Sequence, residues 1–154
     1  MAGALSRHPV VTDPSMQALR GAAVGEPVLA HSPQGAPAFW LVPLLSGPRA
    51  CGFSRVGLDG RIAQMGSFGA GGHDVAAWPE ADFFRQPPLR VLDEVRTRHL
   101  GAPLAEPVFA YDGSPARWGW CIAVGEPASS VVYITPGGWY EKPPERAVPP
   151  AREG

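Results

Sequence analysis

The chain has 154 residues, of which 45% are hydrophobic and 18% charged, and its formal net charge is −1 at pH 7. This composition fits one compact domain or two half-size units that share a core, and it is too apolar for wholesale disorder. A net charge near zero excludes the strongly basic surface of a nucleic-acid-binding protein and the polybasic segment of a membrane anchor. No stretch approaches the roughly 20 apolar residues of a membrane span, and the N-terminus has no apolar signal-peptide core. We therefore predict a cytoplasmic protein without nucleic-acid or membrane partners.

A stretch near the N-terminus occurs a second time later in the chain. Residues 21–31 and 101–111 share a Gly-Ala opening, a Glu-Pro-Val core and the Ala that follows. Similar turn and strand patterns follow both copies, which predicts an internal duplication. The predicted organisation is a flexible lead-in over 1–12, a first repeat over 13–66, a glycine-rich linker over 67–77, a second repeat over 78–142 and a disordered proline-rich tail over 143–154.

The first repeat is predicted to begin with a helix and to continue as a meander. A helix is expected from Pro14 to about Ala22, because Asp13 can cap it and Pro14 suits the first helical position. It ends before Pro27, since the residue preceding a proline avoids the helical region. The apolar runs and turn residues that follow predict strands over 28–32, 38–45, 51–57 and 61–65.

The second repeat shows the same order of elements. Leu92, Val95 and His99 fall at helical spacing within a helix predicted from Pro88 to His99. The strands predicted after it cover residues 108–111, 117–124, 129–135 and 139–142. The predicted fold class is therefore α+β, with two α-β-β-β-β repeats whose antiparallel sheets join or face one another.

This order of elements resembles the PepSY-like and cystatin-like repeats of bacteria. The segments that carry the resemblance are Phe39-Trp40-Leu41-Val42, Gly52-Phe53, Arg55-Val56 and Asp59-Gly60-Arg61-Ile62, with Gly57-Leu58 inserted before the last of them. The tandem layout is also similar to that of the β-lactamase-inhibitory protein family. The resemblance implies a sheet surface that binds proteins and has no catalytic centre.

Residues suited to catalysis or metal binding are few. Cys51 and Cys121 lie in apolar strand patterns, which indicates buried thiols. With His73 or His99 they form the one set that could supply a nucleophile and a base, so a Cys/His enzyme stays as an alternative. The histidines and acidic residues have no metal-ligand spacing, and we expect neither a metal nor a cofactor.

Strand alternation divides the aromatic residues between two faces of the sheet. Trp40 and its alternate neighbours align with Trp118, Trp120 and Ile122, and we expect this set to pack beneath the helices. The opposite face then carries aromatic and arginine side chains, which are typical of interface hot spots. The predicted partner-binding residues are Phe39, Phe53, Arg55, Ile62, Arg117, Tyr133 and Tyr140.

These patterns predict a non-catalytic module that binds another protein or a peptide on the sheet face, as an inhibitor, adaptor or assembly factor. A homodimer is a second option for the partner. An alternative is a small-molecule-binding protein with a pocket between helix and sheet near Trp118, Trp120 and His99.

Overall fold

The computed structural model describes residues 19–68 and 78–145, most of which form a single sheet. The strands are β1 (Ala23–Val24), β2 (Val28–His31), β3 (Pro37–Ser46), β4 (Arg49–Gly57), β5 (Ile62–Ser67), β6 (Val108–Asp112), β7 (Ser114–Val124), β8 (Ser130–Thr135) and β9 (Gly138–Lys142). Between β5 and β6 lie the 3₁₀ helix η5 (Ala81–Phe84) and the α-helix α2 (Leu89–Arg98). The sheet order is β5-β4-β3-β2-β6-β7-β8-β9, and β1 pairs with β3.

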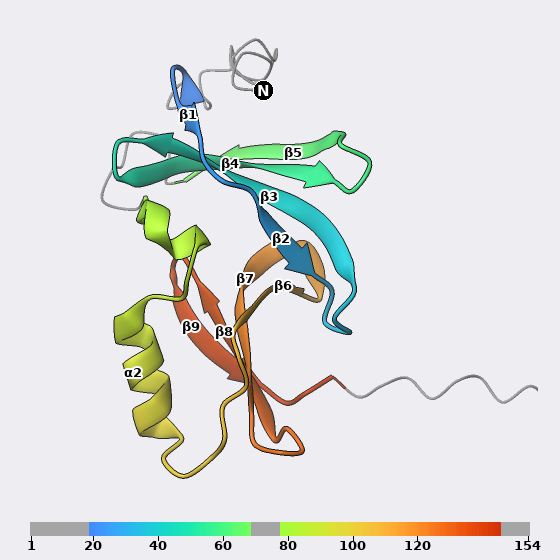
Figure 1. Cartoon of the computed structure of the whole chain (residues 1–154), viewed down its shortest axis with the longest axis vertical. Coiled ribbons are helices and arrows are strands. Elements are labelled where there is room, and N and C mark those ends of the chain that lie inside the picture. Colours follow the sequence, from blue (N-terminus) through green and yellow to red (C-terminus); the bar gives the residue numbers. More distant parts are fainter. Residues whose placement is uncertain (1–18, 69–77, 146–154) are drawn as a thin grey trace, which may run out of the picture.

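Two antiparallel meanders, β2 to β5 and β6 to β9, make up the sheet. Their first strands pair in parallel around His31 and Ala110, and this pairing joins the meanders. The sheet twists so strongly that the strands of the two meanders run at a steep angle to each other (Figure 1). The eight strands predicted for these meanders are confirmed to within a few residues at their ends. The hairpin turn at Asp59 and Gly60 is confirmed as well, with Gly60 at a φ of 82°.

The prediction of two helix-plus-meander repeats is wrong. Within the described residues α2 is the single α-helix, and it precedes the second meander. Of the helix predicted from Pro14 to Ala22, residues 14–18 lie outside the described residues, and Leu19 to Ala22 form a turn. Gly21 adopts a φ of 71° there, and β1 then pairs with β3, so the chain is already extended where the helix was expected to end.

The fold is therefore mainly β, with one mixed sheet and one α-helix, and not α+β with two helical repeats. A PepSY-like or cystatin-like repeat needs a helix ahead of each sheet, so neither that resemblance nor the one to the β-lactamase-inhibitory protein layout holds. The predicted lead-in over 1–12, and most of the linker over 67–77 and of the tail over 143–154, lie outside the described residues.

Helix α2 confirms the second predicted helix and lies along the second meander (Figure 1). Val95 is fully buried on its inner side, where Val91 and Leu92 also pack against the core. On its outer side Arg90 and Glu94 form an i,i+4 ion pair with 3.5 Å between the charged groups. No helix in the described part of the chain is long and apolar enough to span a bilayer.

One apolar core spans both meanders. It lies between a face of the sheet and the layer made by η5 and α2, and it joins Phe39 and Leu41 of β3 to Trp118 and Trp120 of β7. The indole Nε1 of Trp120 donates a hydrogen bond to the backbone carbonyl of Phe83 in η5 at 2.6 Å. Because both meanders contribute to one core, they form a single folding unit.

Strand β3 is buried on both faces, which corrects the predicted assignment of faces. Phe39 and Leu41 face the common core, whereas Leu44 packs with Cys51 in a second cluster on the other side. Trp40 is 38% exposed and does not share the core face with Trp118. An apolar run on a strand that is covered on both sides has no clear alternation of apolar and polar residues. The sequence therefore did not show which residues of β3 point to which face of the sheet.

Candidate functional site

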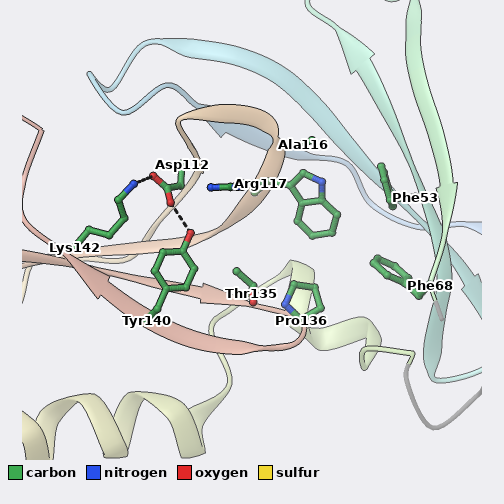
Figure 2. Close-up of a pocket in the computed structure, with 10 residues that line it drawn as sticks. Phe53, Phe68, Asp112, Ala116, Arg117, Thr135, Pro136, Tyr140 and Lys142 are labelled. Atoms are coloured by element: carbon green, nitrogen blue, oxygen red, sulfur yellow. Dashed lines mark hydrogen bonds and ion pairs between the residues drawn. The ribbon is translucent and has the colours of Figure 1, made fainter. Parts of the chain in front are cut away.

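An open cleft of about 590 Å³ lies between the first residues of β7 and the turn that joins β8 to β9. Strand β7 pairs with β8 from Trp120 onward, opposite Ile134, and none of the earlier residues of β7 pairs with the β8–β9 hairpin. Figure 2 shows this space, which we call the hairpin cleft, with aromatic rings at one end and charged groups at the other. Its lining residues are Phe53, Phe68, Asp112, Ala116, Arg117, Trp118, Thr135, Pro136, Tyr140 and Lys142.

Three aromatic rings form the apolar wall of the hairpin cleft. The ring centroid of Phe53 in β4 lies 5.2 Å from that of Trp118 in β7, in an edge-to-face arrangement. Phe68, which follows β5, lies 5.7 Å from Phe53 and 6.1 Å from Trp118 between ring centroids. Such clusters add stability beyond the area that they bury. Phe53 and Phe68 are half-buried and Trp118 is 7% exposed, so the two phenylalanines present most of the apolar surface of this wall. The wall is shared, since β4 and β5 belong to the first meander and β7 to the second.

A buried carboxylate organises the polar end of the hairpin cleft. The side chain of Asp112 is 3% exposed, and its Oδ1 accepts a hydrogen bond from Nζ of Lys142 at 2.7 Å. Its Oδ2 accepts a hydrogen bond from the hydroxyl of Tyr140 at 2.6 Å. The Tyr140 ring stacks on Tyr133 with 5.4 Å between centroids, and Nζ of Lys142 lies 6.0 Å from the Tyr133 centroid. Both carboxylate oxygens are therefore held by donors from the edge strand β9.

This network sets the ionisation of its members. Burial acts to raise the pKa of Asp112, but the hydrogen bonds from Lys142 and Tyr140, with the charges of Lys142 and Arg117, outweigh it and lower the pKa below 3.8. Burial, the hydrogen bond to Asp112 and the charge of Asp112 raise the pKa of the Tyr140 hydroxyl to about 12. Near neutral pH, Asp112 is ionised and Tyr140 is a neutral hydrogen-bond donor.

The lowered pKa of Asp112 predicts a loss of stability in acid. A carboxyl group whose pKa is lower in the folded state stabilises the fold above its unfolded pKa of 3.8, and this stabilisation disappears as the pH falls through the lower folded pKa. We expect the Asp112→Asn variant to be less stable than the wild type at neutral pH and to lose less stability between about pH 5 and pH 2. Urea unfolding across this range measures both effects. Asp93→Asn, at an exposed site on α2, should keep the acid sensitivity of the wild type, and an Asp112→Asn variant that also keeps it would contradict the assignment.

Arg117 lies between the two ends of the hairpin cleft (Figure 2). It is exposed, and its positive charge acts on Asp112 and Tyr140 at a distance. Within residues 19–68 and 78–145 its guanidinium makes no hydrogen bond or ion pair, and Asp112 accepts its hydrogen bonds from Lys142 and Tyr140 instead. The lining residues thus carry one carboxylate and two cations, so one cation has no counter-ion among them.

The hairpin cleft brings together three of the seven predicted partner-binding residues, namely Phe53, Arg117 and Tyr140. The other four lie elsewhere. Phe39 is 5% exposed within the core, and the guanidinium of Arg55 lies 5.6 Å from the centroid of its ring. Tyr133 is buried beneath Tyr140, and Ile62 is exposed at the start of β5. The structure thus divides the predicted patch between the two faces of the sheet.

Seven of the ten lining residues were not in the predicted partner-binding set, and Asp112 and Phe68 are among those that lay outside the predicted strands. The strand predicted over 108–111 ends one residue before Asp112, but β6 includes it. The alternation of Val108 and Ala110 continues to Asp112, and this puts it on the face of Tyr133 and Tyr140. Extending the strand by one residue would have revealed it. Phe68 was placed in the linker, and no local signal marks it as part of an aromatic wall.

The structure separates the residues of the two alternative sites. The Cys51 thiol donates to the carbonyl of Leu44 at 3.3 Å, and Cys121 lies next to Tyr133 on the neighbouring strand. Nε2 of His99 lies 2.7 Å from Oε1 of Glu141, and no histidine among the described residues is hydrogen-bonded to either thiol; His73 lies outside them.

Burial raises the pKa of the Cys51 thiol, and it raises that of Cys121 to about 11, so both thiols stay protonated near neutral pH. Of the three residues proposed for a small-molecule pocket, Trp118 lines the hairpin cleft and Trp120 lines a separate hollow beneath α2. His99 lines neither of these two spaces.

Comparisons of the chain with protein-family models, with curated proteins and with solved structures find no match in any of the three.

Proposed function

We propose that this protein is a non-catalytic binding module and that the hairpin cleft holds a segment of another protein or a peptide. The observation that carries the proposal is the junction, in one open cleft, of an aromatic wall with a polar end of net positive charge. Binding sites commonly pair a mostly apolar surface with a few placed polar groups that fix orientation.

The open shape of the hairpin cleft favours a peptide segment over a small molecule. Sites for small molecules bury most of the ligand surface, typically about 70–90% of it. The hairpin cleft is open to solvent. A ligand bound in the cleft keeps one side exposed to water. This suits a peptide segment, whose chain enters and leaves a groove.

The chemistry of the lining residues supports binding rather than catalysis. Catalysis by proton transfer needs a group that can exchange a proton near the working pH. Asp112 has a lowered pKa and is committed to two donors, while Tyr140 has a pKa of about 12. Asp112 and Tyr140 therefore keep fixed protonation states near neutral pH, which suits them to hydrogen bonding and not to proton transfer.

A steric block tests this proposal. Ala116 is exposed, lines the hairpin cleft and makes no core contact, so Ala116→Tyr should obstruct the cleft and leave the fold intact. Peptides selected on the wild-type protein from a random display library should bind the Ala116→Tyr variant at least about 10-fold more weakly. Ala63→Tyr, at an exposed position of β5 that does not line the cleft, is the matched control and should bind like the wild type.

Binding by fluorescence anisotropy and melting temperatures of all three proteins should be measured together. A library that yields no binding peptide would contradict the proposal. Selected peptides that bind the Ala116→Tyr variant as tightly as the wild type would contradict it as well.

A further inference from the structure

The charges around the hairpin cleft identify what kind of segment it accepts. Its charged lining residues are Asp112, Arg117 and Lys142, and the first and last of these neutralise each other across 2.7 Å. Glu145, the acidic residue that follows β9, does not line the cleft, and its carboxylate accepts a hydrogen bond from Gln34 at 3.2 Å. The unmatched charge of the cleft is therefore the guanidinium of Arg117.

The polar end leaves Arg117 available for an external anion. Asp112 is the one carboxylate among the lining residues, and it accepts its hydrogen bonds from Lys142 and Tyr140, not from Arg117. A guanidinium presents parallel N–H donors in a planar fork, which matches the two oxygens of a carboxylate. A carboxylate that reaches Arg117 therefore gains a charge-assisted partner without breaking the internal network.

The position of Arg117 sets what must accompany that carboxylate. It lies between Asp112 and the rings of Phe53 and Phe68 (Figure 2), and all of them line the same cleft, so a segment bound to Arg117 can extend along the cleft to the aromatic wall. An aromatic or large aliphatic side chain next to the acid would lie against Phe53, Phe68 and Trp118 and would remove apolar surface from water.

From this arrangement, and on the basis of the function proposed above, we infer that the hairpin cleft recognises an acidic peptide segment in which a carboxylate is adjacent to a large apolar side chain. Arg117 binds the carboxylate, and the aromatic wall receives the neighbouring side chain. A segment with a cation at the same position is disfavoured, because it would face the unmatched charge of Arg117.

Two matched display libraries test the inference. Both carry random flanking residues around a fixed central pair, which is Phe-Asp in one library and Phe-Asn in the other. On the wild-type protein the Phe-Asp library should enrich at least about 10-fold more than the Phe-Asn library. Arg117→Gln should remove this difference. Arg61→Gln, at an 89% exposed arginine in the β4–β5 turn that does not line the cleft, should preserve it.

The outcomes separate the inference from the proposal on which it rests. Equal enrichment of both libraries, lost on the Ala116→Tyr variant, would overturn the acidic preference and leave the binding function standing. Enrichment of neither library on the wild type would overturn both. Displacement of a selected Phe-Asp peptide by N-acetylphenylalanine at the same concentration as by the peptide itself would identify a small acid as the ligand and overturn the assignment to a peptide.

Discussion

The Gly119→Ala variant is expected to lose about 3 kcal/mol of unfolding free energy, because a methyl group at this position has no space. A Cβ on Gly119 would meet the backbone carbonyl oxygen of Ile134 in β8, and it would lie 3.0 Å from the carbonyl carbon of the same residue. Backbone atoms in a paired strand cannot rotate away as a side chain can, so β7 and β8 must separate. The separation begins where the hairpin cleft opens, and it would displace Trp118 and Trp120 from the core.

Gly137→Ala provides the control for this prediction. Gly137 lies in the turn between β8 and β9, and a Cβ there would meet no atom within 4 Å. Its effect on the unfolding free energy should stay within about 0.5 kcal/mol. Urea unfolding followed by tryptophan fluorescence measures both variants. Equal stability of the Gly119→Ala and Gly137→Ala proteins would show that β7 and β8 do not approach as closely as described.

Removing the Trp120 side chain should destabilise the protein by about 3–5 kcal/mol. This residue is 8% exposed, packs edge-to-face on Phe109 with 5.2 Å between centroids, and connects the sheet to η5 through its hydrogen bond to Phe83. Trp120→Ala leaves a cavity beneath the helical layer. Trp120→Phe keeps most of the ring but leaves the buried Phe83 carbonyl without its donor, which should cost about 1–3 kcal/mol.

Trp40→Phe is the matched control for the hydrogen-bond component. Trp40 is 38% exposed on β3, and within the described residues its indole makes no hydrogen bond, so the same substitution there should change stability by about 0.5 kcal/mol or less. Thermal and urea unfolding of the two Trp→Phe variants gives the comparison. A Trp120→Phe variant as stable as Trp40→Phe would mean that η5 is not held to the sheet by this bond.

Local signals in the sequence were sufficient to locate eight of the nine described strands and one helix. The Asp59-Gly60 turn, the apolar runs between glycines and prolines, and the helical spacing of Leu92 and Val95 all act over a few residues, and the structure confirms the elements that they predict. The prediction that Trp118 and Trp120 of β7 face the core was also correct, because polar or small residues occupy the alternate positions of this strand.

The features that were not predicted depend on distant parts of the chain. The parallel pairing of β2 with β6 at His31 and Ala110 joins segments about half the chain apart, and no turn residue encodes it. The sequence did not show which residues of β3 point to which face of the sheet, because each face is covered by a different segment. The hairpin cleft needed Phe53 from β4 and Arg117 from β7 to be brought together, which only the assembled sheet achieves.

The shared aromatic wall has a mechanical consequence for the whole sheet. Backbone pairing between the two meanders is confined to a short parallel contact around His31 and Ala110, so the angle between them depends on side-chain packing away from this contact. Phe53 and Phe68 on one side and Trp118 on the other contribute to this packing at the edge of the common core. On the function proposed above, a segment bound in the hairpin cleft contacts both meanders, through Phe53 of the first and Trp118 of the second, and therefore restricts the angle between them.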